Sequence, residues 1–237
     1  MKFVIDRSEE RGHVCLGWLD SKHSFSFGQY YNPSKINFGL LRVLNDDKIS
    51  GGQGFGMHPH ENMEIITIPL KGDLEHKDSM GNTAVIKNGD IQVMSAGSGV
   101  YHSEFNHSKT DDVELLQIWI FPDADNYTPR YDQKSIAELL NPNEFSQVLN
   151  PKDKGNGVWI HQNAYMSIGE WDNDVEKIYA FNIKGNGAYI FVIEGTIEVE
   201  GNILLRRDAM GIWETDTFKV KSIGKSKFLI IEVPIHR

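Results

Sequence analysis

The sequence predicts an all-β protein made of two β-barrels or sandwiches in tandem. Most of the chain consists of short segments rich in β-branched and aromatic residues, such as MEIITIPLKG, AVIKNGD and ELLQIWIFP, separated by Gly, Asn and Asp. The order of these segments repeats between the two halves. The length of 237 residues is also enough for two domains of about 100 to 120 residues, each with its own core.

The internal repeat is seen in two pairs of matching segments. EIITIPLKGDLEHKDSMGN in the first half resembles YIFVIEGTIEVEGN in the second, which aligns Gly72 with Gly195. ELLQIWIFP, ending at Pro122, matches KFLIIEVP, ending at Pro234. The alternative is that β proteins in general share this strand-turn-strand pattern. Because the order and spacing of the segments also agree, duplication of one β-barrel unit is the simpler interpretation.

A different kind of sequence separates the halves. Residues 122–157 are rich in Pro, Asn, Asp and Gly, and they contain the one segment that predicts a helix, between Lys134 and Leu149. Ser135 and Glu138 form a capping-box pattern at its start. We therefore predict an N-terminal barrel over residues 1–125, a linker with a short helix over 126–157 and a C-terminal barrel over 158–237.

Composition excludes several classes of function. The net charge is −9 and the densest basic cluster is Arg206-Arg207, so we expect no direct binding of nucleic acid. The apolar runs are far shorter than the ~20 residues that span a bilayer, so we expect no membrane segment. The sole cysteine, Cys15, cannot form an intramolecular disulfide, and MKFVIDRSEERG lacks an apolar signal core. These features predict a cytoplasmic protein.

Two short motifs in the N-terminal half carry metal-binding chemistry. In a strand, residues i and i+2 project from the same face, so His58 and His60 place two imidazoles side by side. His102 and Glu104 repeat that spacing. Three imidazole nitrogens and one carboxylate suit a mid-to-late transition metal and leave room for water, O₂ or substrate. The pattern is therefore that of an open catalytic site, whereas a structural zinc site would more often use cysteine.

A single His-x-His pair is weak evidence, because nine His in 237 residues give roughly 0.3 such pairs by chance. The surrounding residues strengthen the case, since both pairs lie among regularly placed polar and glycine landmarks. These landmarks are Gly52, Glu64 and Gly72 around the first pair and Gly89, Asp90, Gly97, Gly99 and Asn106 around the second. They resemble the two motifs of the cupin superfamily, small β-barrels that hold a metal with ligands from both motifs.

The departures from the general cupin pattern point to one family. Ser95 occupies the usual proline position, two extra residues precede His102, and Glu104 is an additional carboxylate. RGHVCLGWLDSKHSFSFGQYYNP, GFGMHPHENMEI, HKDSMGN and IQVMSAGSGVYHSEFN closely resemble the pirin family of bicupins, including its bacterial members. The resemblance implies two tandem cupin barrels (double-stranded β-helix, or jelly-roll) joined by a short helical linker.

The resemblance also implies a set of metal ligands, which fall on His58, His60, His102 and Glu104. It further implies that Glu64, a ligand in many other cupins, is not one here. Strand alternation counted from His60 turns Glu64 inward together with Ile66 and Ile68. We therefore expect these three side chains beside the ligands or in the pocket.

The other histidines and the second half show no comparable pattern. Aligning Gly72 with Gly195 puts Phe181 and Ile183 in place of the two histidines of the first motif, so we expect a C-terminal barrel without a metal. Six histidines lack a second ligand at a suitable spacing and are expected at the surface or as satisfied core residues: His13, His23, His76, His107, His161 and His236.

The ligand set does not by itself select one divalent ion. We expect iron(II), with nickel, manganese, cobalt, copper and zinc also compatible. The pirin resemblance implies quercetin 2,3-dioxygenase activity, in which a flavonol hydroxyl coordinates the metal and O₂ opens the heterocyclic ring with loss of carbon monoxide. Glu104 would then be both a ligand and the base that takes the flavonol proton, a transfer worth roughly 10² to 10⁴ in rate.

Two other functions stay open at this point. The first is a regulatory or redox-sensing protein that binds a protein partner, as the resemblance implies for nuclear pirins that act as transcription cofactors. The absence of a basic patch and of a localisation signal disfavours a nuclear role. The second is a bicupin whose metal mainly stabilises the barrel. The physiological substrate and the oligomeric state are not determined by the sequence.

Overall fold

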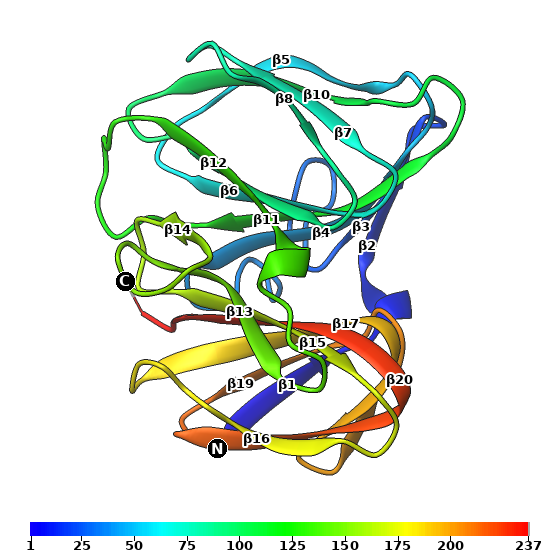
Figure 1. Ribbon diagram of the computed structural model, residues 1–237, viewed down its shortest axis with the longest axis vertical. Coiled ribbons are helices and arrows are strands. Elements are labelled where there is room, and N and C mark those ends of the chain that lie inside the picture. Colours follow the sequence, from blue (N-terminus) through cyan, green and yellow to red (C-terminus); the bar gives the residue numbers. More distant parts are fainter. Residues whose placement is uncertain (237) are drawn as a thin grey trace.

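The computed structural model describes residues 1–236 and contains two β-barrels packed one on the other (Figure 1). The N-terminal barrel has a seven-stranded and a four-stranded sheet. The four-stranded sheet has the order β5 (Gly54–His60), β10 (Val100–Asn106), β7 (Leu74–Asp78) and β8 (Thr83–Ile86). The seven-stranded sheet has the order β12 (Arg130–Ser135), β9 (Asp90–Ser95), β6 (Glu64–Lys71), β11 (Val113–Ile120), β4 (Leu41–Ile49), β3 (Leu19–His23) and β2 (Gly12–Cys15).

One nine-stranded sheet forms the C-terminal barrel. Its order is β1 (Lys2–Asp6), β19 (Ala209–Trp213), β17 (Asn186–Val199), β20 (Thr217–Pro234), β15 (Tyr165–Trp171), β13 (Phe145–Pro151) and β14 (Val158–Ile160), with β16 (Glu176–Ala180) on β20 and β18 (Asn202–Leu204) on β17. The long strand β20 serves both layers of the barrel, because its first half pairs with β16 and its second half with β15.

The strand pairing confirms the predicted duplication. In the first barrel β11 pairs with β4, β6 with β9 and β10 with β5. In the second, the corresponding pairs are β20 with β15, β17 with β19 and β20 with β16. Gly72 and Gly195 both adopt a left-handed conformation, with φ of 70° and 81°, at equivalent bends. A strand, a turn and a strand in the first barrel thus become one continuous bent strand in the second.

The two barrels share a hydrophobic core. Alternate residues of β17 and β20 face two different clusters, Phe191 and Leu229 toward the first barrel and Ile190 and Ile230 toward the interior of the second. Burial on both faces explains why these strands are apolar runs rather than alternating sequences. From the first barrel, the shared core receives Ile66, Ile68, Leu116 and Ile118, and from the second Val148, Leu149, Met166 and Ile168. The first barrel thus packs on the second through its seven-stranded sheet, whereas β5 and β10, which carry the metal-binding motifs, belong to the four-stranded sheet.

The helix predicted between Lys134 and Leu149 is wrong. This region contains the end of β12, a single 3-10 turn η2 (Ile136–Glu138) and β13. Ser135 makes no capping hydrogen bond. The reason is tertiary, because β12 completes the edge of the first sheet beside β9 and β13 pairs with β15 in the second. Strand pairing on both sides of a short turn outweighs a local helical pattern.

The domain limits also differ from the prediction. Residues 1–125 do not all lie in the first barrel, since β1 pairs with β19 of the second and the 3-10 turn η1 (Ser8–Glu10) leads the chain back. The linker predicted over 126–157 is divided between the sheets, with β12 in one and β13 in the other. Asp6, at the end of β1, also ties the N-terminus to the second barrel, because it accepts a hydrogen bond from Tyr189 of β17 at 2.8 Å. Among residues 1–236, no helix is long and apolar enough to cross a membrane.

Candidate metal centre

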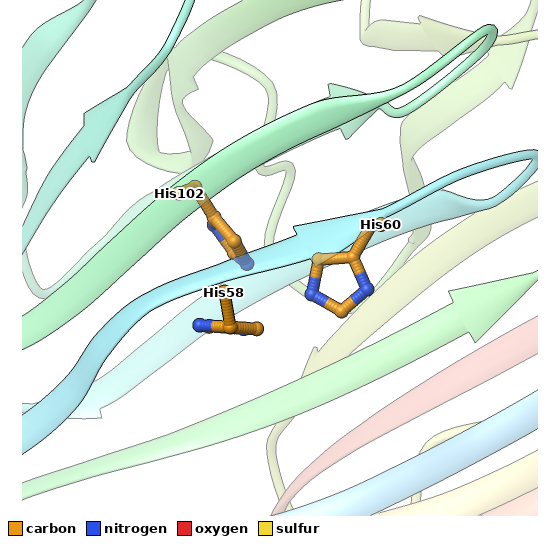
Figure 2. Close-up of side chains that lie close together, drawn as sticks. All are labelled: His58, His60 and His102. Carbon is orange, nitrogen blue, oxygen red and sulfur yellow. The ribbon is translucent and has the colours of Figure 1, made fainter.

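The two metal-binding motifs lie on adjacent strands. β5 and β10 are antiparallel, and their register places His102 directly opposite His58. Figure 2 shows His58 and His60 projecting from one strand and His102 from its neighbour, with the three rings gathered on the same side. Their ligand atoms lie within 4.8 Å of one another. The structure therefore brings the three predicted histidines together.

The hydrogen bonding of these rings leaves nitrogen lone pairs for a metal. His58 Nδ1 lies 2.7 Å from the Gly56 carbonyl oxygen, which can only accept, so His58 carries its proton there and its Nε2 is free. His60 Nε2 and both ring nitrogens of His102 are buried without a hydrogen-bond partner. Buried polar atoms without partners are rare in proteins. These orphaned nitrogens fit a divalent metal.

The electrostatic environment keeps two of the rings neutral. Burial, with smaller effects from the neighbouring imidazoles, lowers the pKa of His60 to about 4 and that of His102 to about 3. Both side chains are therefore unprotonated at neutral pH. This is the state in which imidazole binds a metal ion.

Glu104 lies next to His102 but is held differently from the three histidines. The pairing of β10 with β5 shifts in register between His102 and Glu104, so Glu104 lies opposite Phe55, and it is almost fully buried. Gln117 Nε2 donates to its two oxygens at 3.1 and 2.9 Å, and Thr67 Oγ1, which lies 3.4 Å from one of them, donates to Gln117 Oε1 at 3.0 Å. The ligand atoms of Glu104, His102 and His76 lie within 4.8 Å of one another. Glu104 is not part of the group formed by His58, His60 and His102.

The sequence prediction describes His76 only in part. It was expected at the surface or as a satisfied core residue, and it is a fully buried residue that groups with His102 and Glu104 and has one unsatisfied nitrogen. Its Nε2 lies 3.0 Å from Asp78 Oδ2, and its Nδ1 has no partner. A signal was present in the sequence, because His76 and Asp78 have the same i, i+2 spacing on a strand as the two predicted pairs.

Glu64, Ile66 and Ile68 do not lie beside the histidines. Ile66 and Ile68 belong to the core shared with the second barrel. Glu64 also faces that barrel, where its carboxylate lies 3.0 Å from His161 Nδ1 and accepts a hydrogen bond from Ser95 at 2.6 Å. The expectation that these three residues line the pocket is therefore corrected.

The error comes from extending strand alternation through a turn. His60 ends β5 in one sheet and Glu64 begins β6 in the other, and between them Asn62 adopts a left-handed φ of 48°. The alternation restarts in β6, where Ile65 and Thr67 face the barrel interior and the even-numbered residues face outward. Period-two arguments hold only within one uninterrupted strand.

An open depression adjoins the site. It has a volume of about 520 Å³ and is lined by Pro59, His60, Glu61, Ser98, Gly99, Val100 and Tyr101. Beside it, the ring of Trp119 packs edge-on against His60 with centroids 4.9 Å apart. Trp119 also packs with an apolar cluster that contains Ile65, Met94 and Val100. The polar ligand cluster thus lies against a buried apolar cluster.

The glycine turn before β10 gives a testable prediction. Gly97 has a φ of 48°, and an added Cβ would lie 1.9 Å from the Tyr127 carbonyl oxygen. Gly28 has a similar φ of 55° with nothing within 4 Å, so it is a matched control. We expect Gly28→Ala to lower the free energy of unfolding by about 1 kcal/mol and Gly97→Ala by at least about 3 kcal/mol, measured by urea denaturation. Equal losses would contradict the close contact with Tyr127.

Comparisons with known proteins agree with this fold and site. The family described as Pirin matches residues 4–120, and the family described as Quercetinase C-terminal cupin domain matches residues 147–233. An Escherichia coli (strain K12) protein named quercetin 2,3-dioxygenase is 38% identical over 232 residues, which cover 97% of this chain and 98% of the relative. The chain belongs to the pirin family. A Pasteurella multocida relative of this pirin, named as a putative quercetin 2,3-dioxygenase, is also 38% identical, over 95% of the chain and 97% of its own length.

Solved structures give the same result. The crystal structure of YhhW from Escherichia coli superposes with a TM-score of 0.93 at 36% identity and covers 100% of both chains. Bacterial pirin YhhW in complex with nickel(II) also has a TM-score of 0.93, covering 98% of this chain and 99% of that one. The conserved fold, the His and Glu cluster and the nickel complex of this relative support a divalent metal in this pirin chain.

Proposed function

We propose that the chain is a metal-dependent dioxygenase that cleaves quercetin-like flavonols, with the metal held by His58, His60, His102 and Glu104. The observation that carries the proposal is the set of buried imidazole nitrogens without partners beside a buried carboxylate. The relative named quercetin 2,3-dioxygenase, which matches almost the full chain, supports the choice of substrate. Iron(II) is the metal that we expect in the native protein, and the ligand set also suits nickel, manganese, cobalt, copper or zinc.

When bound, the metal supplies Lewis acidity and a common position for the flavonol hydroxyl and O₂. The residues of the chain bind and orient the substrate. Val100 lines the open depression beside His60, and it packs in an apolar cluster with Ile65, Met94 and Trp119. The indole Nε1 of Trp119 is buried without a hydrogen-bond partner in this cluster.

Glu104 is the residue that we expect to take the flavonol proton. Gln117 donates to both carboxylate oxygens, which fixes the plane of the carboxylate while leaving lone pairs free. A carboxylate held in this way accepts a proton at either oxygen without moving. Such positioning is characteristic of a general base, whose contribution is typically about 10² to 10⁴ in rate.

The test is carbon monoxide release from quercetin under O₂ by the protein loaded with iron(II) or nickel(II). We expect CO release and loss of quercetin absorbance in the natural chain. Glu104→Gln should lower kcat by about 10² to 10⁴. His107→Ala is the control, because that imidazole is exposed and lies 3.7 Å from Glu75, away from the ligands. Turnover that persists unchanged in a His102→Ala, Glu104→Ala double variant would falsify the proposal.

A second candidate is a metal-dependent or redox-sensing regulator that binds a protein partner. The observation in its favour is that Met57 and Tyr101, on the strands that carry the histidines, are 59% and 55% exposed. A change in how the histidines of β5 and β10 bind the metal would therefore alter this exposed surface directly. A set of captured proteins that differs between the ferrous and ferric forms would favour the regulator, and an identical set would favour the enzyme. We also propose a cytoplasmic location, supported by the single cysteine.

A further inference from the structure

The strongest unexplained feature of the first barrel is the arrangement of His76. Its side chain is fully buried, as is the side chain of Asp78. Asp78 is itself fixed, because it accepts hydrogen bonds from the backbone amides of Met80 and Asn82 at 2.9 and 3.0 Å and from the side chain of Asn82 at 2.8 Å. The loop after β7 therefore holds one carboxylate rigidly against one imidazole.

This arrangement selects one tautomer of His76. With three donors of the following loop on its two oxygens, the Asp78 side chain can only accept from His76 Nε2, which lies 3.0 Å from its Oδ2. The lone pair of His76 then lies on Nδ1, which is buried without a partner. A carboxylate that orients an imidazole in this way is typical of metal-binding histidines.

His76 lies among other residues that can bind a metal. Strand pairing between β7 and β10 places His76 opposite Glu104 and Asp78 opposite His102. The ligand atoms of His76, His102 and Glu104 lie within 4.8 Å of one another, and all three residues are buried. Both ring nitrogens of His102 are without partners, so this ring can serve the group that contains His76 as well as the group that contains His58.

We propose that His76 is a metal-binding residue that forms, with His102 and Glu104, an inner position for a divalent transition-metal ion. This inner position overlaps the outer position, formed by His58, His60 and His102, through the shared ring of His102. Two imidazoles and one carboxylate are ligands suited to such ions and match the number of protein ligands at open catalytic sites. The inference rests on the proposed binding of a divalent ion in this barrel and is independent of flavonol cleavage.

The inner position also gives a reason for the placement of Glu104. Glu104 does not group with all three histidines of the outer position but does group with His76. Gln117 holds its carboxylate in this place, and Thr67 in turn donates to Gln117. Two overlapping positions allow one ion to move between a site nearer the open depression and a deeper site that contains the carboxylate.

The experiment is cobalt(II) binding by the full chain, stripped of metal with a chelator and then measured by equilibrium dialysis, elemental analysis and the visible spectrum of cobalt. The variant His58→Ala, His60→Ala removes two ligands of the outer position and none of the inner one. We expect it to bind one cobalt per chain. Adding His76→Ala should weaken that binding at least tenfold, and adding Asp78→Asn should weaken it about 10- to 100-fold. The matched control adds His107→Ala to the double variant instead, and it should leave the cobalt affinity unchanged.

Two results would overturn the inner position. One is a double variant that is folded by circular dichroism but takes up no cobalt, and the other is equal cobalt affinity with and without His76. If the double variant does not fold, anomalous diffraction from cobalt in the natural protein decides. An ion within about 2.1 Å of His76 Nδ1 supports the proposal, whereas density confined to the outer position at saturating cobalt rejects it. Carbon monoxide release tests the dioxygenase separately, so either proposal can fail alone.

Discussion

Replacing His102 with alanine is expected to abolish uptake of a divalent metal and to lower flavonol turnover by at least about 10³-fold. His102 is the residue shared by both groups of ligand atoms. Its ring centroid lies 4.4 Å from that of His58, 4.8 Å from that of His60 and 5.4 Å from that of His76. Loss of metal removes several kcal/mol of transition-state stabilisation, and each 1.36 kcal/mol is about tenfold in rate.

The measurement is nickel or iron content per chain after dialysis, together with carbon monoxide release. His107→Ala is the control for the loss of one imidazole, because it leaves both ligand groups intact. Circular dichroism must show that the His102→Ala variant keeps its β structure. A folded His102→Ala variant that still binds one metal ion with unchanged affinity would show that the centre does not depend on this ring.

The parts of the site that could be predicted from the sequence are those that depend on short spacing within one strand. His58 and His60 project together because they lie two residues apart on β5, and His102 joins them because β10 pairs with β5. Glu64 was misplaced because a turn lies between it and His60, and strand alternation gives no information across a turn. Strand alternation is therefore reliable for two residues within one strand. It fails where the chain turns from one sheet into another.

His76 and the predicted helix show a second limit. The spacing of His76 and Asp78 is visible in the sequence, but only the pairing of β7 with β10 places them beside Glu104. Similarly, Ser135 and Glu138 have a helical capping pattern, yet the open edge beside β9 recruits the preceding residues into a strand. Which strand lies beside which is decided by the whole barrel, so contacts between distant segments were not predictable from local patterns.

Acidification of the metal-free protein is expected to lower its free energy of unfolding steeply between about pH 6.5 and pH 5. Histidine in the unfolded chain titrates near pH 6.5. In the folded protein, burial lowers the pKa of His60 to about 4 and that of His102 to about 3. Over this window the unfolded chain binds protons that the folded protein does not, so stability falls as the pH falls. The loss levels off only once the pH has passed below both folded values.

Urea denaturation of the metal-free protein at pH 7, 6.5, 6, 5.5 and 5 measures this effect. Each pH unit contributes about 1.4 kcal/mol for each histidine that stays unprotonated in the fold, so His102 by itself should account for about 2 kcal/mol between pH 6.5 and 5. His102→Gln removes that contribution, and its free energy of unfolding should depend less steeply on pH. His107→Ala, which removes an exposed ring, should keep the slope of the natural chain. Identical slopes in the natural protein and in His102→Gln would mean that the buried ring of His102 is not held neutral. In that case the argument that its unpartnered nitrogens are prepared for a metal would lose its electrostatic basis.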